Sequence, residues 1–419
     1  MWRATRSWVI VDMMEIRLHS TDRAPLRPLF ELAEDSRAQL DAYIEAGRVL
    51  VARTADGPIG HLQLVEASDG GWEIKNMAVR PADQGHGVGR ALVAAAIEEI
   101  GDDPGTTITV ATAAADVGNL RFYQRLGFRI TGVEPDAFTP ADGYPVGTRV
   151  DGIELRDRVW FALVLPTDEG LYRRGERSLL ASWEAYARGT AGAGVRRLPG
   201  VAAAVFPNDP ERGVYNNAVL AEGLDAAARA AAVGAMEAAY AAAGVAGFAA
   251  SVREGDAAMR RDLEARGYTV AETTRAMGMS LAELRVAEPG IDAESWTWPD
   301  YLRTFDLPAR LLATADRAAF RLVVARVDGE PVAAGLTLDC DRDCGIYNVG
   351  TVEPMRRRGI ATALTARILH DARARGCVTA TLQSTPAAEG VYAAAGFRDL
   401  GRILEYAPRG GASSTPIGR

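Results

Sequence analysis

The stretch Gln84-Gly85-His86-Gly87-Val88-Gly89-Arg90 follows an extended run at 72–79 and leads directly into a helical pattern at 91–97. Three glycines in five residues let the backbone turn tightly and leave amide N–H groups free at the positive end of a helix, where an anion binds well. The spacing is neither that of the dinucleotide fingerprint nor that of a P-loop. Alone, the stretch predicts either a phosphate cradle or a simple helix cap.

A similar stretch, Arg356-Arg357-Arg358-Gly359-Ile360-Ala361, follows an extended run at 346–352 and precedes a helical pattern at 364–369. Each copy is followed by a strand pattern, a helix and an aromatic strand start, which read Tyr123-Gln124-Arg125-Leu126-Gly127-Phe128 and Tyr392-Ala393-Ala394-Ala395-Gly396-Phe397. The three arginines would also suit a solvated charge run, but their place directly before a glycine at a helix start favours phosphate binding.

These paired motifs resemble the GNAT superfamily of acyl-CoA-dependent N-acyltransferases, with its pyrophosphate loop and its Tyr-x-x-x-Gly-Phe element. The resemblance implies an α/β (α+β) fold in which a mixed central sheet is flanked by helices. The element order that it implies, β-α-β-β-β-α-β-α-β-β, is also the order of the patterns along 15–165. It further implies an N-acetyltransferase that takes acetyl-CoA as its acyl donor.

A third copy of the unit is predicted between the other two, because 196–284 shows the same order of elements and has Gly267-Tyr268 where the other units have Gly-Phe. It has Glu222-Gly223-Leu224-Asp225 in place of the glycine loop, so we expect a degenerate, structural module, with an unrelated α/β insert as the alternative. The expected organisation is an N-terminal extension at 1–14, a GNAT acetyltransferase domain at 15–165, a linker and helix at 166–195, a degenerate GNAT-like domain at 196–284, a second GNAT acetyltransferase domain at 285–407 and a disordered tail at 408–419.

Composition narrows the class of protein. The 419 residues are 48% hydrophobic and 24% charged, and the net charge of −8 argues against a general nucleic-acid surface. The three cysteines form no even disulfide framework, so a reducing, cytoplasmic setting is expected. The four histidines lack ligand spacing, so no metal is expected, and no apolar run is long enough for a membrane span. The expected partner is a small molecule, and a homodimer is left open.

The resemblance assigns roles within the N-terminal unit. The backbone of the cradle, from Gln84 to Arg90 and including His86, would hold the pyrophosphate. Met77 and Val79 would pair with the pantetheine arm, Asn119 would fix that arm, and Tyr123 would protonate the departing thiolate. A tyrosine pKa near its usual value of about 10 suits a thiolate of similar basicity. The alternative for Tyr123 is an ordinary core aromatic.

Glu73 is the candidate for the base that removes a proton from the attacking amine. Alternate residues of a strand share a face, so Glu73 is expected on the same face as Met77 and Val79. The alternative is a solvated edge acid. His61 and His86 are expected to be spectators in proton transfer.

The second GNAT domain has Tyr392 and the cradle Arg356, Arg357, Arg358, Gly359, Ile360 and Ala361, with Val352 on the strand before it as a further cofactor-binding residue. That strand, 346–352, contains no carboxylate. Asp339, Asp341 or Glu353 would then serve as base, or a water relay would suffice, or this domain binds acyl-CoA without efficient turnover.

An insertion at 134–157 carries six acids, and by resemblance it borders the acceptor site, where an acidic lip would suit a cationic amine; an ordinary solvated loop is the alternative. The N-terminal unit resembles small bacterial acetyltransferases that modify antibiotics or have unknown substrates. The predicted function is acetyl transfer from acetyl-CoA to a primary amine of a small molecule, an antibiotic or a metabolite, by direct attack in a ternary complex. The alternatives are a tandem enzyme similar to mycothiol synthase, with its C-terminal unit active, and a non-catalytic acyl-CoA-binding or sensing protein.

Overall fold

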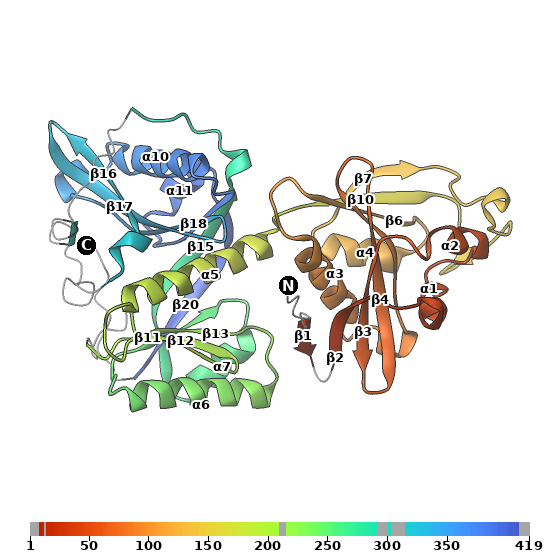
Figure 1. The fold of residues 1–419 in the computed structure, drawn as a ribbon, viewed down its shortest axis with the longest axis horizontal. Helices are drawn as coiled ribbons and strands as arrows, with labels where there is room; N and C mark the ends of the chain where they lie inside the picture. Colours follow the sequence, from red (N-terminus) through yellow and green to blue (C-terminus); the bar gives the residue numbers. More distant parts are fainter. Residues whose placement is uncertain are drawn as a thin grey trace. The chain divides into compact units, whose positions relative to one another are not determined.

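The computed structural model describes residues 8–11, 14–208, 215–290, 298, 301–302 and 315–409. The chain divides into two compact units, Met1–Thr167 and Asp168–Arg419 (Figure 1). The first boundary lies within two residues of the one expected at 165. The second unit includes the segments that were expected as a linker, a degenerate domain and a second GNAT domain. Most of the expected tail, 410–419, lies outside the described residues.

The N-terminal unit alternates strands and helices in the expected order. Its elements are β1 (Trp8–Val11), β2 (Met14–His19), α1 (Arg27–Phe30), α2 (Arg37–Tyr43), β3 (Arg48–Thr54), β4 (Gly57–Glu66), β5 (Trp72–Val79), α3 (Val88–Ile100), β6 (Thr107–Ala113), α4 (Val117–Arg125), β7 (Arg129–Glu134), β8 (Arg149–Val150), β9 (Ile153–Glu154) and β10 (Arg158–Val164).

Eight of these strands form one mixed sheet in the order β1-β2-β3-β4-β5-β6-β10-β7. Side chains of a strand alternate between the two faces, and β3 shows the result. Leu50 and Ala52 join the core under α3 and α4, whereas Val49 and Val51 join the core under α1 and α2. The expected N-terminal extension includes a strand of this sheet, since β1 pairs with β2.

The C-terminal unit contains a longer series of elements. They are α5 (Asp168–Ala187), β11 (Gly194–Leu198), β12 (Val201–Val205), β13 (Asn217–Leu220), α6 (Ala226–Ala242), β14 (Ala249–Arg253), α7 (Ala257–Ala265), β15 (Tyr268–Ser280), β16 (Arg321–Val327), β17 (Glu330–Cys340), β18 (Asp343–Thr351), α10 (Ile360–Ala374), β19 (Thr379–Ser384), α11 (Glu389–Ala395) and β20 (Arg398–Pro408).

The strands of this unit form a single ten-stranded sheet, in which β15 and β20 each serve two halves. In the N-terminal unit the closing strands follow the order β6-β10-β7; here the corresponding orders are β14-β20-β15 and β19-β15-β20. The C-terminal part of β20 thus lies between β14 and β15, and the C-terminal part of β15 lies between β19 and β20. Each half completes its sheet with a strand of the other. The boundary expected at 284/285 therefore does not divide two compact units.

The segment expected as a linker contains α5, which lies on one face of this sheet (Figure 1). Trp183 of α5 packs in one core with Phe206 and Leu336, and Ser178 donates a 2.6 Å hydrogen bond to the buried carboxylate of Asp343. The opposite face is covered by α6 and α7 over one half and by α10 and α11 over the other.

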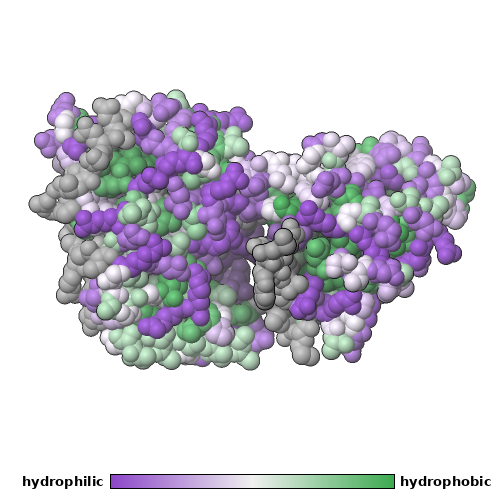
Figure 2. Space-filling view, in the orientation of Figure 1, coloured by the Kyte–Doolittle hydropathy of each residue, from purple (hydrophilic) through white to green (hydrophobic). Residues whose placement is uncertain are grey.

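Hydrophilic residues cover much of the visible face of each unit, and the region over α6 is a paler, weakly apolar green because that helix is rich in alanine (Figure 2). None of the described helices is both long and apolar enough to cross a bilayer.

Candidate active site

The first cradle has the backbone that its glycines predict. Gly85 and Gly87 have φ angles of 78° and 85°, a region that glycine adopts without strain. Gly87 is the N-cap of α3 and no side chain caps this end, so the N–H groups at the start of α3 remain available to an anion. A Cβ at Gly89 would lie 3.1 Å from the ring of Phe122, which explains the third glycine.

A gap in the sheet opens beside this cradle. β5 pairs with the parallel strand β6 only from Trp72 to Ile74, although β5 continues to Val79. Beyond Ile74 the edge of β5 that faces β6 has backbone groups without a ladder partner. Such an edge can pair with an extended ligand.

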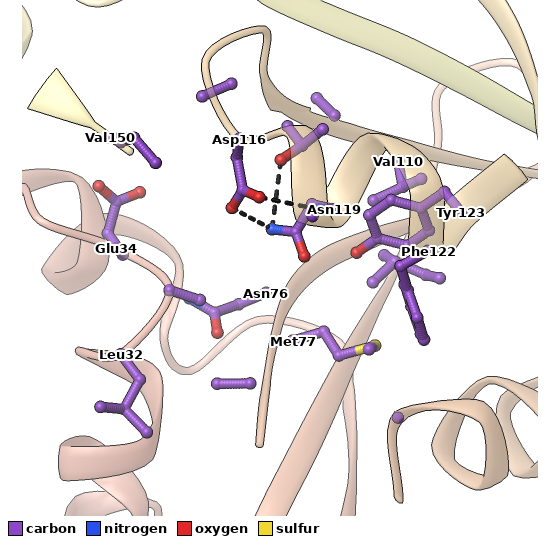
Figure 3. A pocket seen from close by; sticks show the side chains of 18 of the residues that line it. Leu32, Glu34, Asn76, Met77, Val110, Asp116, Asn119, Phe122, Tyr123 and Val150 are labelled. Atoms are coloured by element: carbon purple, nitrogen blue, oxygen red, sulfur yellow. Dashed lines mark hydrogen bonds between the residues drawn. The ribbon is translucent and has the colours of Figure 1, made fainter. Parts of the chain in front are cut away.

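A cleft of about 1360 Å³ extends along this edge. It is lined by almost all the residues predicted for the N-terminal site, namely Glu73, Met77, Val79, Gln84, Gly85, Gly87, Val88, Gly89, Arg90, Asn119 and Tyr123. His86 of the predicted cradle does not line it and is exposed. Figure 3 looks into this cleft, with Met77 of β5, Tyr123 and Phe122 of α4, and Glu34 around one hollow.

The predicted face of Glu73 is wrong. The pairing of β4 with β5 shifts between Gln63 and Leu64, so Lys75 is an extra residue, a β-bulge, and the alternation of side chains reverses there. Met77 and Val79 pack against the core under α3, whereas Lys75 lies 5.5 Å from the ring of Tyr43 of α2. Glu73 forms a 3.1 Å ion pair with Lys75, so it lies on the α2 side, across the sheet from Met77 and Val79.

Tyr123 is held inside an aromatic cluster. Its side chain is 6% exposed and its ring contacts Phe122, Phe128 and Phe161. Burial, and then the charge of Asp116, raise the pKa of Tyr123 well above its usual value. The expectation of a pKa near 10 is therefore wrong. Tyr123 keeps its proton at neutral pH, as a proton donor must.

Asn119 lies on the first turn of α4. Its side-chain amide donates a 2.8 Å hydrogen bond to one carboxylate oxygen of Asp116 (Figure 3). The other oxygen of Asp116 accepts a hydrogen bond from the backbone N–H of Asn119 and so caps the helix. The side chain is thereby oriented along the wall of the cleft. Its contact with a cofactor arm stays a prediction.

A hydrogen-bonded cluster in the cleft was missed from the sequence. Glu34 accepts a 2.7 Å hydrogen bond from the hydroxyl of Tyr144 and a 3.3 Å one from that of Tyr43. Asn76 donates a 2.8 Å hydrogen bond to the Tyr43 hydroxyl and accepts a 2.9 Å hydrogen bond from the buried ring of His61. The polar residues inside strands β4 and β5 were a signal of this cluster, but Glu34 follows α1 in a loop that carries no motif.

The insertion at 134–157 borders the cleft in part. Glu134, Asp136 and Asp142 line it, as do the rings of Phe138 and Tyr144. Ion pairs offset some of the acidity, since Arg158 lies 3.2 Å from Glu134 and Arg156 lies 2.6 Å from Asp136. The remaining acids of the insertion, Asp151, Glu154 and Asp157, do not line the cleft.

The second cradle repeats the geometry of the first. Gly359 is the N-cap of α10 with φ of 77° and no side-chain cap, and Arg357 has φ of 59°. The side chain of Arg356 donates a 3.1 Å hydrogen bond to the carbonyl oxygen of Thr351, just as that of Gln84 donates a 3.0 Å hydrogen bond to the carbonyl oxygen of Val79. Tyr392 is buried, and burial raises its pKa to about 12. The middle segment differs, because Asp225 caps α6 through the N–H of Ala228 and occupies the place of an anion.

Val352 does not suit the role predicted for it. Its N–H donates a 2.9 Å hydrogen bond to the carbonyl oxygen of Val332, and its own carbonyl oxygen accepts a hydrogen bond from the N–H of Met355. Both backbone groups of Val352 therefore already have partners. Arg80 makes the same bonds in the N-terminal unit, to Ile59 and from Asp83, so Val352 corresponds to Arg80. The counterparts of Met77 and Val79 are accordingly Val349 and Thr351.

Two of the base candidates of the second domain lie far from its cradle. Asp339 and Asp341 are at the turn between β17 and β18, and nine-residue β18 spans about 26 Å to the cradle end at some 3.3 Å per residue. Burial raises the pKa of Asp339, but two hydrogen bonds from Arg375 outweigh it and hold the pKa below its usual value. A carboxylate paired in this way is a weak base.

Comparison with known proteins identifies the family. Residues 45–130 match the acetyltransferase (GNAT) domain, and residues 285–397 match the acetyltransferase (GNAT) family. The chain is 32% identical over 149 residues to the uncharacterized N-acetyltransferase YvbK of Bacillus subtilis. These 149 residues make up 36% of this chain and 95% of YvbK. The chain belongs to the GNAT family of acetyltransferases. The family and the mixed α/β fold predicted from the two motifs are thus confirmed, and the protein is an acyltransferase.

Two solved structures of acetyltransferases are similar to part of the chain. A GNAT family acetyltransferase from Elizabethkingia anophelis, with acetyl-CoA bound, is 28% identical, with a TM-score of 0.34 over 37% of this chain and 100% of that one. An acetyltransferase from Bacillus subtilis in complex with CoA is 33% identical, with a TM-score of 0.33 over 36% of this chain and 97% of that one.

Proposed function

We propose that the N-terminal unit of this GNAT protein transfers an acetyl group from acetyl-CoA to a primary amine of a small molecule. The observation that carries the proposal is the single cleft that brings together an uncapped helix start, the free edge of β5, Tyr123 and Glu73. Each is a part that amide formation from a thioester requires, and they come from three separate places in the sequence, namely β5, the start of α3 and α4.

The donor would lie along the gap between β5 and β6. Its pyrophosphate would accept hydrogen bonds from the N–H groups at the start of α3, where the helix dipole adds to the attraction. Its pantetheine amides would pair with the free edge of β5 near Met77 and Val79. A backbone N–H of this edge would also donate to the thioester oxygen as negative charge develops there.

The chemical step follows from the groups around that thioester. The amine nitrogen attacks the carbonyl carbon, the C–N bond forms, and the C–S bond breaks. Glu73, directly or through water, takes the proton that the amine loses, and Tyr123 gives the proton that the thiolate gains. The raised pKa of Tyr123 keeps that proton available throughout the neutral range.

The acceptor would enter from the α1 and α2 side, where Glu73 lies. Glu34 is the carboxylate that this side presents beside the hydroxyls of Tyr43 and Tyr144, and a cationic amine would pair with it. Among the ion pairs described, Glu73 pairs with Lys75 and two acids of the insertion pair with arginines. Glu34, its neighbour Asp35, and Asp142 are the lining acids around this part of the cleft that have no basic partner among those pairs. This favours a small cationic acceptor.

The experiment is a thiol-release assay with acetyl-CoA and a panel of amines, aminoglycosides and amino-sugar thiols. We expect turnover by the wild-type chain, its loss in Tyr123→Phe and its retention in Tyr392→Phe. The reverse pattern would move the activity to the C-terminal unit, as the alternative similar to mycothiol synthase predicts. Release of thiol by no member of the panel would count against a small-molecule amine as the acceptor.

A further inference from the structure

A second cavity, of about 230 Å³, lies within the C-terminal unit between α5 and the ten-stranded sheet. The α5 side of its lining includes Tyr172, Trp183 and Tyr186, and further rings come from Tyr215 and Tyr347. Tyr186 and Tyr215 meet edge to face at 5.4 Å between ring centres. The wall of the cavity on the α5 side is thus largely aromatic.

The opposite wall carries carboxyl groups. Glu272 of β15 and Glu405 of β20 are direct cross-strand partners in the sheet, and both line the cavity together with Glu176 of α5. Among the described residues that line this cavity, none is a lysine, an arginine or a histidine. Like charges directly opposite each other on neighbouring strands destabilise a sheet, so the pair calls for a compensating cation.

The pKa values of these carboxyl groups reflect the absence of a basic side chain among the described residues of the cavity lining. Burial, and then the charge of Glu272, raise the pKa of Glu405 to about 7, against a hydrogen bond from Asn217. Burial also raises the pKa of Glu272 and, together with Glu169, that of Glu176. Nearby arginines act on Glu176, since Arg173, Arg253 and Arg177 oppose the rise of its pKa. Arg253 is itself engaged, because it lies 2.6 Å from Glu169, 3.0 Å from Glu222 and 4.0 Å from the ring centre of Tyr172.

An unused hydroxyl lies beside the pair. Thr274 follows Glu272 on the same face of β15 and lines the cavity, its side chain is 9% exposed, and its Oγ1 has no hydrogen-bond partner among the described residues. A buried hydroxyl without a partner is unfavourable, and a ligand that donates an N–H would satisfy it.

We propose that this cavity binds a small organic ammonium ion, with its nitrogen at Glu405 and Glu272 and its apolar body against the rings of Trp183 and Tyr186 of α5. Carboxylates opposite aromatic faces are a favourable setting for such a cation. Its size must be modest, because the cavity is smaller than the roughly 300–1,000 Å³ of drug-sized sites. The site is separate from the N-terminal cleft and does not depend on the function proposed for it.

The exchange of strands gives this site its composition. Glu272 lies on a strand that began in the middle segment, and Glu405 lies on the last strand of the chain. The cavity also reaches Ile346, Tyr347 and Asn348, where β18 stops pairing with β19 on its way to the second cradle. The middle segment, although it has no cradle of its own, thereby contributes to a ligand site next to the second cradle.

The test is calorimetric titration of the full-length chain with benzylamine and 2-phenylethylamine, and with benzyl alcohol and 2-phenylethanol as neutral counterparts. We expect the amines to bind and the alcohols to bind at least tenfold more weakly, because a charge-assisted hydrogen bond is lost. Glu405→Gln should weaken amine binding by about tenfold while Glu254→Gln, an exposed acid that follows β14, should not. Melting temperatures of both variants should be no lower than that of the wild type, which excludes misfolding.

Three results would overturn the proposal: no amine binding at millimolar concentration, equal binding of amines and alcohols, or equal binding by Glu405→Gln and the wild type. Binding in the N-terminal cleft is distinguished by Glu34→Gln, which should leave this signal unchanged; a signal lost in Glu34→Gln and kept in Glu405→Gln would place the amine in the N-terminal cleft instead. Titration at neutral pH in two buffers of different ionisation enthalpy should also show proton release, since a cation lowers the pKa of Glu405. Binding without proton release would place the cation away from that carboxyl.

Discussion

The side-chain amide of Gln84 donates a 3.0 Å hydrogen bond to the carbonyl oxygen of Val79, five residues earlier in the chain. This bond ties the start of the cradle to the end of the strand whose free edge faces the cleft. Arg356 and Thr351 make the corresponding bond in the C-terminal unit. Two different side chains therefore make the same bond between a cradle and the end of the strand before it.

Gly87→Ala should weaken acetyl-CoA binding. Alanine at φ of 85° costs about 1–2 kcal/mol and would displace the helix start from the anion. The loss of one charge-assisted hydrogen bond, about 1.5–3 kcal/mol, predicts a KM for acetyl-CoA at least tenfold higher. Gly70→Ala is the matched control, because Gly70 also has φ of 85° and open space around an added Cβ, but lies at the other end of β5. An equal rise in KM in both variants would mean that strain alone is responsible.

Tyr123→Phe should lower kcat by about 10²-fold or more, the usual contribution of a general acid, with little change in the KM for acetyl-CoA. The pH profile of the wild type provides an independent check. Because burial raises the pKa of Tyr123, its proton is lost only at strongly alkaline pH, and the rate should show no alkaline limb from this group up to its ordinary pKa of about 10. A variant that keeps wild-type kcat would assign Tyr123 to the core alone.

Glu34→Gln should raise the KM for the amine acceptor by about tenfold or more, since a hydrogen bond to a charged group contributes about 1.5–3 kcal/mol. The KM for acetyl-CoA should stay unchanged. Glu31→Gln is the control, because Glu31 follows the same helix, pairs with Arg27 and does not line the cleft. If both KM values rise together in Glu34→Gln, the residue supports the fold of the cleft rather than the acceptor.

Much of the N-terminal site was predictable because its parts are encoded locally. A tight turn needs glycine, and a turn between a strand and a helix leaves N–H groups free, so Gly85, Gly87 and Gly89 indicate the cradle without a structure. The spacing to Tyr123 then places a helix across the cleft. The bulge at Lys75 was not predictable in this way, because nothing in the residues of β5 marks an extra residue, and a single bulge moves Glu73 to the other face.

The organisation of the C-terminal unit escaped the sequence for a different reason. Repeated patterns show which segments resemble each other, but they do not show which copy a strand pairs with. β15 and β20 are long strands whose two ends belong to different halves, and only the register, Tyr268 opposite Pro408 and Gly278 opposite Arg398, shows it. The carboxylates Glu272 and Glu405 are 133 residues apart in sequence by their numbering and meet through that register alone.

The stability of the N-terminal unit should fall between about pH 6.5 and pH 4 because of His61. Burial lowers the pKa of His61 to about 4, although Asn76 opposes the shift. The unfolded state, with a pKa near 6.5, binds the proton first as pH falls, so stability present above pH 6.5 is lost, by about 3 kcal/mol in total at about 1.4 kcal/mol per unit. Urea unfolding of residues 1–167 at several pH values measures this. His61→Gln should flatten that dependence, whereas His19→Gln, whose ring bonds are exposed, should not.

Division of the C-terminal unit between residues 284 and 285 should leave neither piece folded. Residues 168–284 would lose Leu404 and the fully buried Tyr406 from the core they share with Val252 and Leu263.

Residues 285–419 would lose Met277 and Met279 from the core beneath α10. Removal of a buried aromatic or methionine side chain alone costs about 2–5 kcal/mol, a large part of a domain's 5–15 kcal/mol. Each piece would also expose two strand edges that β15 or β20 now covers, which favours aggregation.

Circular dichroism and size-exclusion chromatography of the separate and co-expressed pieces test this prediction. Co-expression should restore a folded 1:1 complex, because each piece supplies the strand that the other lacks. The control is division after Thr167, at the boundary in the sequence between the two compact units, and both of those pieces should fold. Independent folding of 168–284 and 285–419 would show that each half can close its own sheet, and that the exchange of strands is not required for stability.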